Sequence, residues 1–276
     1  MKNKFYRLSL LVVILAISVF VIPVNAFAPL PRTSTQSTDL LPPILQDQTT
    51  CFSSQIVLII DQSISMVKND SNGLRYYIPL YVADLLAHNY ITARSTATRL
   101  EQPIKTQLAV VQFRVNAVVG LDWTTIAPEN DTAWEEQRAQ IASNSYLTED
   151  QIEEIADELG NGTSHFAAFN KVGELLDRAD PQEAGCPSRT YILLTDGNPD
   201  YAGIPLQGSD LQEEMQKIQV TVDNRLLSEG STLYVTAIND PSNYFWGATE
   251  KYWQAITHNE ERVDVNEPER AEQVST

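Results

Sequence analysis

The chain has 276 residues, and its 36 acidic and 19 basic side chains give a formal net charge of −17 at pH 7. This length allows one domain with a sizeable core, or at most two small ones. So acidic a balance argues against nucleic acids and anionic membranes as partners, because both would repel the chain.

The N-terminus has the pattern of an export signal. Lys2, Lys4 and Arg7 precede an almost wholly apolar run, Leu8 to Val24. Val24-Asn25-Ala26 then fits the small-residue pattern at which signal peptides are cleaved. An uncleaved membrane anchor is the alternative, but the run is at the short end for a spanning helix. Both interpretations predict a secreted or extracytoplasmic protein.

The rest of the chain divides at a change in composition. Residues 1–26 are the predicted signal peptide, and residues 27–50 are rich in Pro, Ser, Thr and Gln with little apolar periodicity. Such a segment is typical of a flexible linker. Residues 51–276 then form the predicted folded domain.

The domain opens on a strand that ends in oxygen-bearing side chains. Ile56 to Ile60 are all apolar, which is typical of a strand buried on both faces of a parallel sheet. Asp61, Ser63 and Ser65 follow, and ligands of open α/β sheets bind at the carboxyl ends of strands. Oxygen ligands suit a hard cation such as Mg²⁺. The alternative is that Asp61 and Ser63 simply cap the following helix.

Strands and helices alternate through the remaining sequence. Apolar periodicity predicts strands over 107–115, 117–121, 191–195, 232–239 and 262–265, and helices over 74–92, 132–142, 148–159, 164–179, 210–228 and 249–257. The alternation predicts an α/β fold that is Rossmann-like and doubly wound. Its mostly parallel sheet has about six strands, one of them an antiparallel edge, with helices on both faces.

Two further segments complete a pattern with the first. Gly160-Asn-Gly-Thr163 leads into a predicted helix, and the strand over 191–195 closes in Thr195-Asp196-Gly197. Together with Asp61-x-Ser63-x-Ser65, and in this order, these segments resemble the von Willebrand factor A (VWA) family. The resemblance covers roughly Cys51 to the C-terminus. In that family the three segments build a metal-ion-dependent adhesion site.

The resemblance implies a role for each of these side chains. Ser63, Ser65 and Thr163 would offer hydroxyl oxygens to Mg²⁺, with Mn²⁺ or Ca²⁺ as alternatives, and Asp61 and Asp196 would act partly through bound water. Neutral hydroxyls leave the ion able to accept one more anionic oxygen, from a Glu or Asp of a protein partner. Thr195 and the backbone N–H of Gly197 are the expected hydrogen-bonding supports of the ligands.

The expected function is therefore non-catalytic recognition of a protein partner. Candidate partner contacts are Asp200 and Tyr201, in a long loop after Asp196, and His165 beside Thr163. A metal-dependent hydrolase is the rival, but the three histidines are not paired at metal-ligand spacing and no hydrolase motif is present. A structural envelope-assembly component is the third hypothesis.

The resemblance also bears on the two cysteines. Cys51 and Cys186 each lie ten residues before a site aspartate. In a VWA-like sheet those strands are parallel neighbours with Asp61 and Asp196 level, which would bring the cysteines within disulfide distance. A Cys51–Cys186 bridge, which fits an oxidising compartment, is expected; two free thiols are the alternative. The last helix of the family is expected to be truncated or unusually short here.

Overall fold

The computed structural model describes residues 54–70, 73–100, 106–145, 147, 149–156, 162–178, 189–227, 231–238 and 244–257. The signal peptide, the linker, the Cys51–Cys186 bridge, the strand over 262–265 and the short last helix lie outside these ranges and stay predictions. None of the helices in the described ranges combines the length and hydropathy needed to cross a lipid bilayer.

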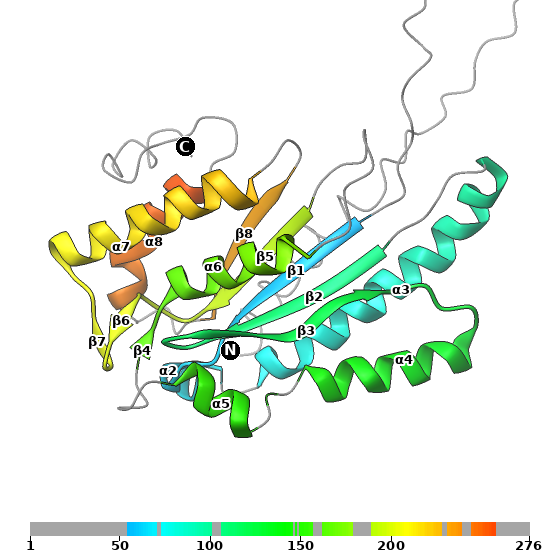
Figure 1. Cartoon of the computed structure of the whole chain (residues 1–276), viewed down its shortest axis with the longest axis horizontal. Coiled ribbons are helices and arrows are strands. Elements are labelled where there is room, and N and C mark those ends of the chain that lie inside the picture. The colour runs from blue at the N-terminus through cyan, green and yellow to red at the C-terminus, as the bar shows by residue number, and fades with distance from the viewer. Residues whose placement is uncertain are drawn as a thin grey trace, which may run out of the picture.

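A five-stranded sheet forms the centre of the fold, in the order β3-β2-β1-β5-β8 (Figure 1). The strands are β1 (Ser54–Asp61), β2 (Thr106–Phe113), β3 (Ala117–Thr125), β5 (Arg189–Thr195) and β8 (Thr232–Ala237). All neighbours are parallel except β2 and β3, which form an antiparallel edge. The expected doubly wound α/β fold is thereby confirmed, with the antiparallel edge strand longer than predicted.

Helices cover both faces of this sheet. In Figure 1, α6, α7 and α8 lie on one side of it, and α3 and α4 lie on the other. The helices are α2 (Ile64–Asn69), α3 (Leu74–Leu100), α4 (Asp131–Asn144), α5 (Glu149–Ile155), α6 (His165–Leu176), α7 (Gly208–Thr221) and α8 (Tyr244–Thr257), and α7 continues into a π-helical turn, η2 (Val222–Leu226).

Strand β1 is buried on both faces, as its unbroken apolar run predicts. Alternate side chains of a strand point to opposite faces. Val57 and Ile59 accordingly join the core under α6, α7 and α8, whereas Leu58 and Ile60 join the core under α3 and α4. Both cores therefore fix β1, and with it the position of the site residues that follow.

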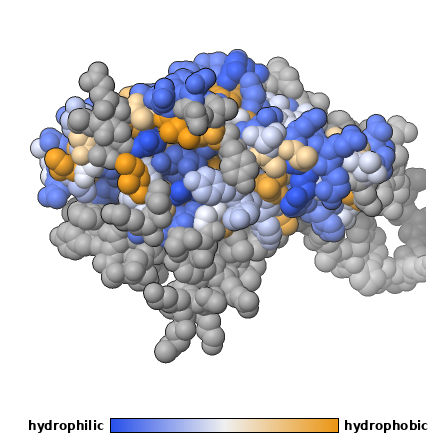
Figure 2. Space-filling model, turned by 90° about the horizontal axis from the view of Figure 1, so that it is seen from below, coloured by the Kyte–Doolittle hydropathy of each residue, from blue (hydrophilic) through white to orange (hydrophobic). Residues whose placement is uncertain are grey.

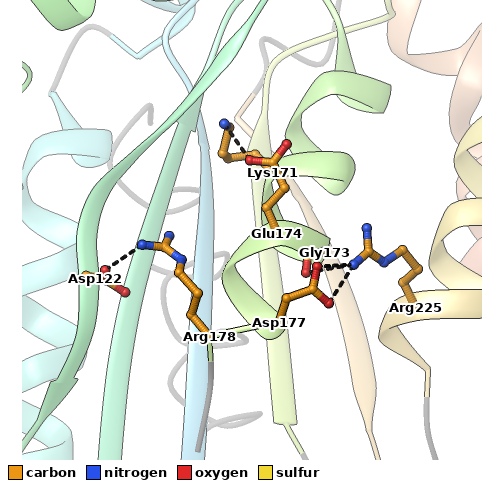
Figure 3. A network of polar contacts seen from close by, with 7 residues as sticks. All are labelled: Asp122, Lys171, Gly173, Glu174, Asp177, Arg178 and Arg225. Atoms are coloured by element: carbon orange, nitrogen blue, oxygen red, sulfur yellow. Dashed lines mark hydrogen bonds and ion pairs between the residues drawn. The ribbon is translucent and has the colours of Figure 1, made fainter.

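Polar contacts hold the C-terminal end of α6 (Figure 3). Arg225 donates to the Gly173 carbonyl at 3.1 Å and to both carboxylate oxygens of Asp177 at 2.8 Å. A methyl group on Gly173 would lie 2.7 Å from the Arg225 guanidinium, so the arginine side chain would have to move to admit one. Arg178 pairs with Asp122 of β3 at 2.9 Å. These contacts tie α6 to the neighbouring elements.

A small second sheet replaces the loop predicted after Asp196. Strands β6 (Asp200–Tyr201) and β7 (Ile204–Pro205) form a hairpin, and β6 pairs antiparallel with β4 (Gly162–Thr163). The hairpin turns through Ala202 at φ 53° and Gly203 at φ 76°. Two left-handed residues match the twist of the strands. The prediction of a plain loop is wrong because the Ala-Gly turn was not recognised as a hairpin signal.

Candidate functional site

The predicted site side chains at the end of β1 converge by hydrogen bonding. The Ser63 N–H donates to Asp61 Oδ1 at 2.7 Å, and the Ser63 and Ser65 hydroxyl oxygens lie 2.9 Å apart. Ser63 occupies the N-cap position of α2, yet its side chain makes no capping bond. The helix-cap alternative therefore does not account for the Ser63 hydroxyl.

Asp196 joins this cluster from the end of the neighbouring strand β5. Its Oδ1 accepts from the Ser65 hydroxyl at 3.0 Å and its Oδ2 accepts from the Asn69 amide at 2.7 Å. Asn69 was not among the site residues predicted from the sequence. Its spacing of four residues from Ser65 within a helix was the available signal, because residues at that spacing share a helix face.

The register between β1 and β5 differs from the predicted one by one residue. Ile60 pairs with Leu194, so Asp61 lies level with Thr195 rather than with Asp196. The Thr195 hydroxyl accordingly donates to Asp61 Oδ2 at 2.7 Å, and the Gly197 N–H donates to the Thr195 oxygen at 3.4 Å. Thr195 therefore supports Asp61, as expected, and Gly197 supports Thr195 rather than a carboxylate.

Thr163, the fifth predicted ligand, lies in a different part of the chain. It is buried, and strand β4 pairs it with Asp200, four residues beyond Asp196. The Ser164 N–H donates to the Arg114 carbonyl at 2.7 Å, which ties this turn to the segment after β2. Within the described ranges, the Thr163 side chain makes no hydrogen bond to the other four predicted ligands. The position of Thr163 is therefore set by the backbone pairing of β4 with β6.

Gly162→Ala tests how that backbone places Thr163. Gly162 has φ 151°, and an added methyl group would lie 2.6 Å from Val115 Cγ2. We expect the variant to lose about 1–3 kcal/mol of stability in urea unfolding, because a side chain is strained there, and to bind Mg²⁺ more weakly. Gly197→Ala is the matched control, because nothing lies within 4 Å of its added methyl group. Equal losses in both variants would contradict this assignment.

The two carboxylates repel each other inside the protein. Burial, followed by the charge of Asp196, raises the pKa of Asp61 to about 7, although hydrogen bonds from Ser63 and Thr195 act in the opposite direction. Burial also raises the pKa of Asp196, against the bonds from Asn69 and Ser65. A divalent cation between these groups would relieve the repulsion.

The structure places the three candidate partner contacts in different surroundings. His165 is fully buried, and burial lowers its pKa to about 3, so it is neutral and cannot touch a partner. The Asp200 carboxylate accepts from the Gly203 N–H at 2.9 Å, which is a turn contact. Tyr201 is 71% exposed at the tip of the hairpin and remains available.

The chemistry of the donor set favours a hard cation. Within the ranges that the structure describes, no three His, Cys, Asp or Glu side chains gather as a metal-binding group. The cluster instead combines two carboxylates with serine hydroxyls and an amide. Such oxygen donors are typical of Mg²⁺, Mn²⁺ or Ca²⁺ sites.

No protein-family model matches the chain, and a search of curated proteins found no relative. Among solved structures, the chain is similar to the PilB minor pilin from Streptococcus sanguinis, with 13% identity, a TM-score of 0.49 and coverage of 80% of this chain and 59% of that one. The vWF domain of the type V pili tip protein Mfa5 from Porphyromonas gingivalis has 13% identity, a TM-score of 0.34 and coverage of 53% and 38%.

A third similar structure is proximal thread matrix protein 1 from the mussel byssus, with a zinc-occupied MIDAS motif. Its identity is 16%, its TM-score 0.36 and its coverage 80% of this chain and 44% of that chain. This chain thus spans between about two fifths and three fifths of the length of these three proteins. At identities and TM-scores this low, the similarity assigns no role, ligand or partner to this chain.

Proposed function

We propose that this chain, whose fold is that of a von Willebrand factor A domain, binds a divalent cation and through it a carboxylate of a protein partner. The observation that carries the proposal is the convergence of Asp61, Ser63, Ser65 and Asp196 from two neighbouring strands. Thr163 is the fifth proposed ligand. Mg²⁺ is the proposed ion.

The role of each ligand follows from its surroundings. Both carboxylates are fully or almost fully buried, whereas Ser65 is exposed. The ion would therefore lie between the carboxylates and the surface, where a position facing solvent can accept an outside oxygen. Two carboxylates nearly neutralise the ion, and the hydroxyls leave it able to bind one more anion.

The surroundings of the ion would add contacts to a protein partner. Ile64, between the two serines, is 49% exposed, and Tyr201 and Ile204 of the hairpin are each 71% exposed. Seen from below (Figure 2), the described surface shows separate hydrophobic areas among hydrophilic ones rather than one broad patch. We therefore propose that the carboxylate–metal contact supplies specificity and that Tyr201 and its apolar neighbours supplement it.

The proposed function is binding rather than catalysis. A hydrolase would need a general base facing the ion. His165, which is the histidine nearest in sequence to a proposed ligand, is buried and does not face solvent at the site. The proposed location is outside the cytoplasm, supported by the charged and apolar N-terminal segment.

Isothermal titration with Mg²⁺ and Mn²⁺ tests the metal site. We expect the wild-type chain to bind one ion and Asp196→Ala to lose at least about 100-fold in affinity, because one of the two carboxylates is removed. Glu136→Ala, an exposed acid on α4, is the control and should bind like the wild type. Absence of metal binding by the wild-type chain would overturn the proposal.

A peptide array tests the partner chemistry. Peptides bearing Asp or Glu should bind in Mg²⁺ and be released by EDTA, whereas the same peptides with Asn or Gln should not bind. The Asp196→Ala variant should bind neither set. Equal binding with and without EDTA would contradict a metal-bridged carboxylate while leaving the metal site itself standing.

A further inference from the structure

A chain of hydrogen bonds leads from the hydrophobic core to the proposed metal site. His165 Nε2 lies 3.0 Å from the Thr195 hydroxyl oxygen, and that hydroxyl donates to Asp61 Oδ2 at 2.7 Å. All three side chains are fully buried. Any role of His165 in metal binding rests on the proposed function, because it would act by orienting a proposed ligand.

The direction of the hydrogen bonds is fixed by counting protons. In its ionised state, which is the state that would bind a cation, the Asp61 carboxylate only accepts, so the single proton of the Thr195 hydroxyl goes to Asp61. The Thr195 oxygen must then accept from His165, which places a proton on Nε2. His165 is therefore the neutral tautomer with Nε2–H, and its Nδ1 carries no proton.

The surroundings of the imidazole give it no other polar role. His165 packs between Phe113, at 5.3 Å between ring centroids, and Trp253 of α8, at 5.2 Å. Within the described part of the chain, its Nδ1 has no hydrogen-bond partner. Burying an unpaired polar atom costs stability, so an apolar side chain of similar size would suit the core better. The imidazole thus has one useful contact, the bond to Thr195.

We propose that His165 is a positioning residue for the metal site: its Nε2–H holds the Thr195 hydroxyl as a donor to Asp61 Oδ2. With Oδ1 held by the Ser63 N–H, the carboxylate then keeps one orientation. A ligand that is already oriented binds metal more tightly, because less freedom is lost on binding. Without His165, only the longer bond of 3.4 Å from the Gly197 N–H holds the Thr195 oxygen, so the hydroxyl is less constrained as a donor to Asp61.

Two substitutions separate this role from simple packing. In His165→Phe the ring packing is kept and the donor is lost; in His165→Gln the donor is kept near the position of Nε2 and the ring is lost. We expect His165→Phe to bind Mn²⁺ about tenfold more weakly than the wild type, and His165→Gln to bind within about threefold. In urea with EDTA the order should reverse, with His165→Phe unfolding at the higher midpoint.

A purely structural role would move affinity and stability together. If His165→Phe binds Mn²⁺ like the wild type, or if both variants lose affinity in proportion to stability, the proposal is wrong. Thr195→Val and Thr195→Ser test the bond from Thr195 to Asp61 with the His165 ring unchanged. The valine variant should bind Mn²⁺ about tenfold more weakly than the wild type, and the serine variant should keep the wild-type affinity. The double variant His165→Phe, Thr195→Val should bind no more weakly than Thr195→Val alone.

Additive losses in that double variant would show that His165 acts by another route and would overturn the proposal. The full chain is used throughout, and Mn²⁺ is titrated calorimetrically. Absence of Mn²⁺ binding by the wild-type chain would instead contradict the proposed metal site itself. The two failures are therefore distinguishable.

Discussion

Lowering the pH from 8 to 6 should weaken Mg²⁺ binding about tenfold. Burial and the charge of Asp196 raise the pKa of Asp61 to about 7, so at pH 6 a proton must leave this carboxylate before the ion can bind. At pH 8 the carboxylate is already ionised. Calorimetric titration at both pH values measures the change, and buffers with different ionisation enthalpies count the protons released.

The stability of the metal-free protein should change in the opposite direction. Because the folded-state pKa of Asp61 lies above its ordinary value of 3.8, its contribution to stability is complete below pH 3.8 and is lost as pH rises through about 7. In EDTA the free energy of unfolding should therefore fall by about 1.4 kcal/mol as the pH is raised from 6 to 8. An equal Mg²⁺ affinity at both pH values would contradict the assignment of Asp61 as a ligand with a raised pKa.

Asp61→Asn should abolish metal binding and at the same time stabilise the metal-free protein. The amide has the shape of the carboxylate but no charge, so the burial penalty and the repulsion with Asp196 disappear, although its NH₂ group replaces one of the two acceptor oxygens. The free energy of unfolding in EDTA at pH 8 should rise by up to about 4 kcal/mol, which corresponds to a pKa of about 7 instead of 3.8. Urea unfolding with EDTA and with Mg²⁺ measures both effects.

Asp200→Asn is the matched control for this variant. Asp200 lies on β6, close to the same site, but its carboxylate accepts from the Gly203 N–H within the hairpin turn. We expect it to keep Mg²⁺ affinity within about threefold and to show no gain in stability. A stability gain in both variants would mean that general acidity, rather than the buried pair, destabilises the metal-free protein.

The order of strands and helices was accessible from the sequence because local patterns specify it. The apolar run of β1 and the helical spacing within α3 and α6 depend only on neighbouring residues. The hairpin of β6 and β7 was not predicted, because each strand has two residues and shows no periodicity. Its pairing with β4 connects segments that are far apart in the chain.

The same division holds for the site. Asp61, Ser63 and Ser65 were predicted because they follow a buried strand at whose carboxyl end ligands bind, and Asp196 because the three segments together resemble the VWA family. Asn69 was not, because its spacing of four residues from Ser65 shows a shared helix face but not that its side chain contacts Asp196. His165 was a candidate partner contact, because a position next to a turn does not reveal whether its side chain points into the core, where the structure places it.

The sequence by itself determined the α/β class, the elements that carry the site and four of the side chains that converge there. Strand periodicity and motif spacing are properties of the chain alone. Only the tertiary structure decided that Asp61 lies level with Thr195, that His165 bonds to Thr195 and that Asn69 holds Asp196. Register and burial depend on how separate segments pack, and a shift of one residue changes which side chains meet.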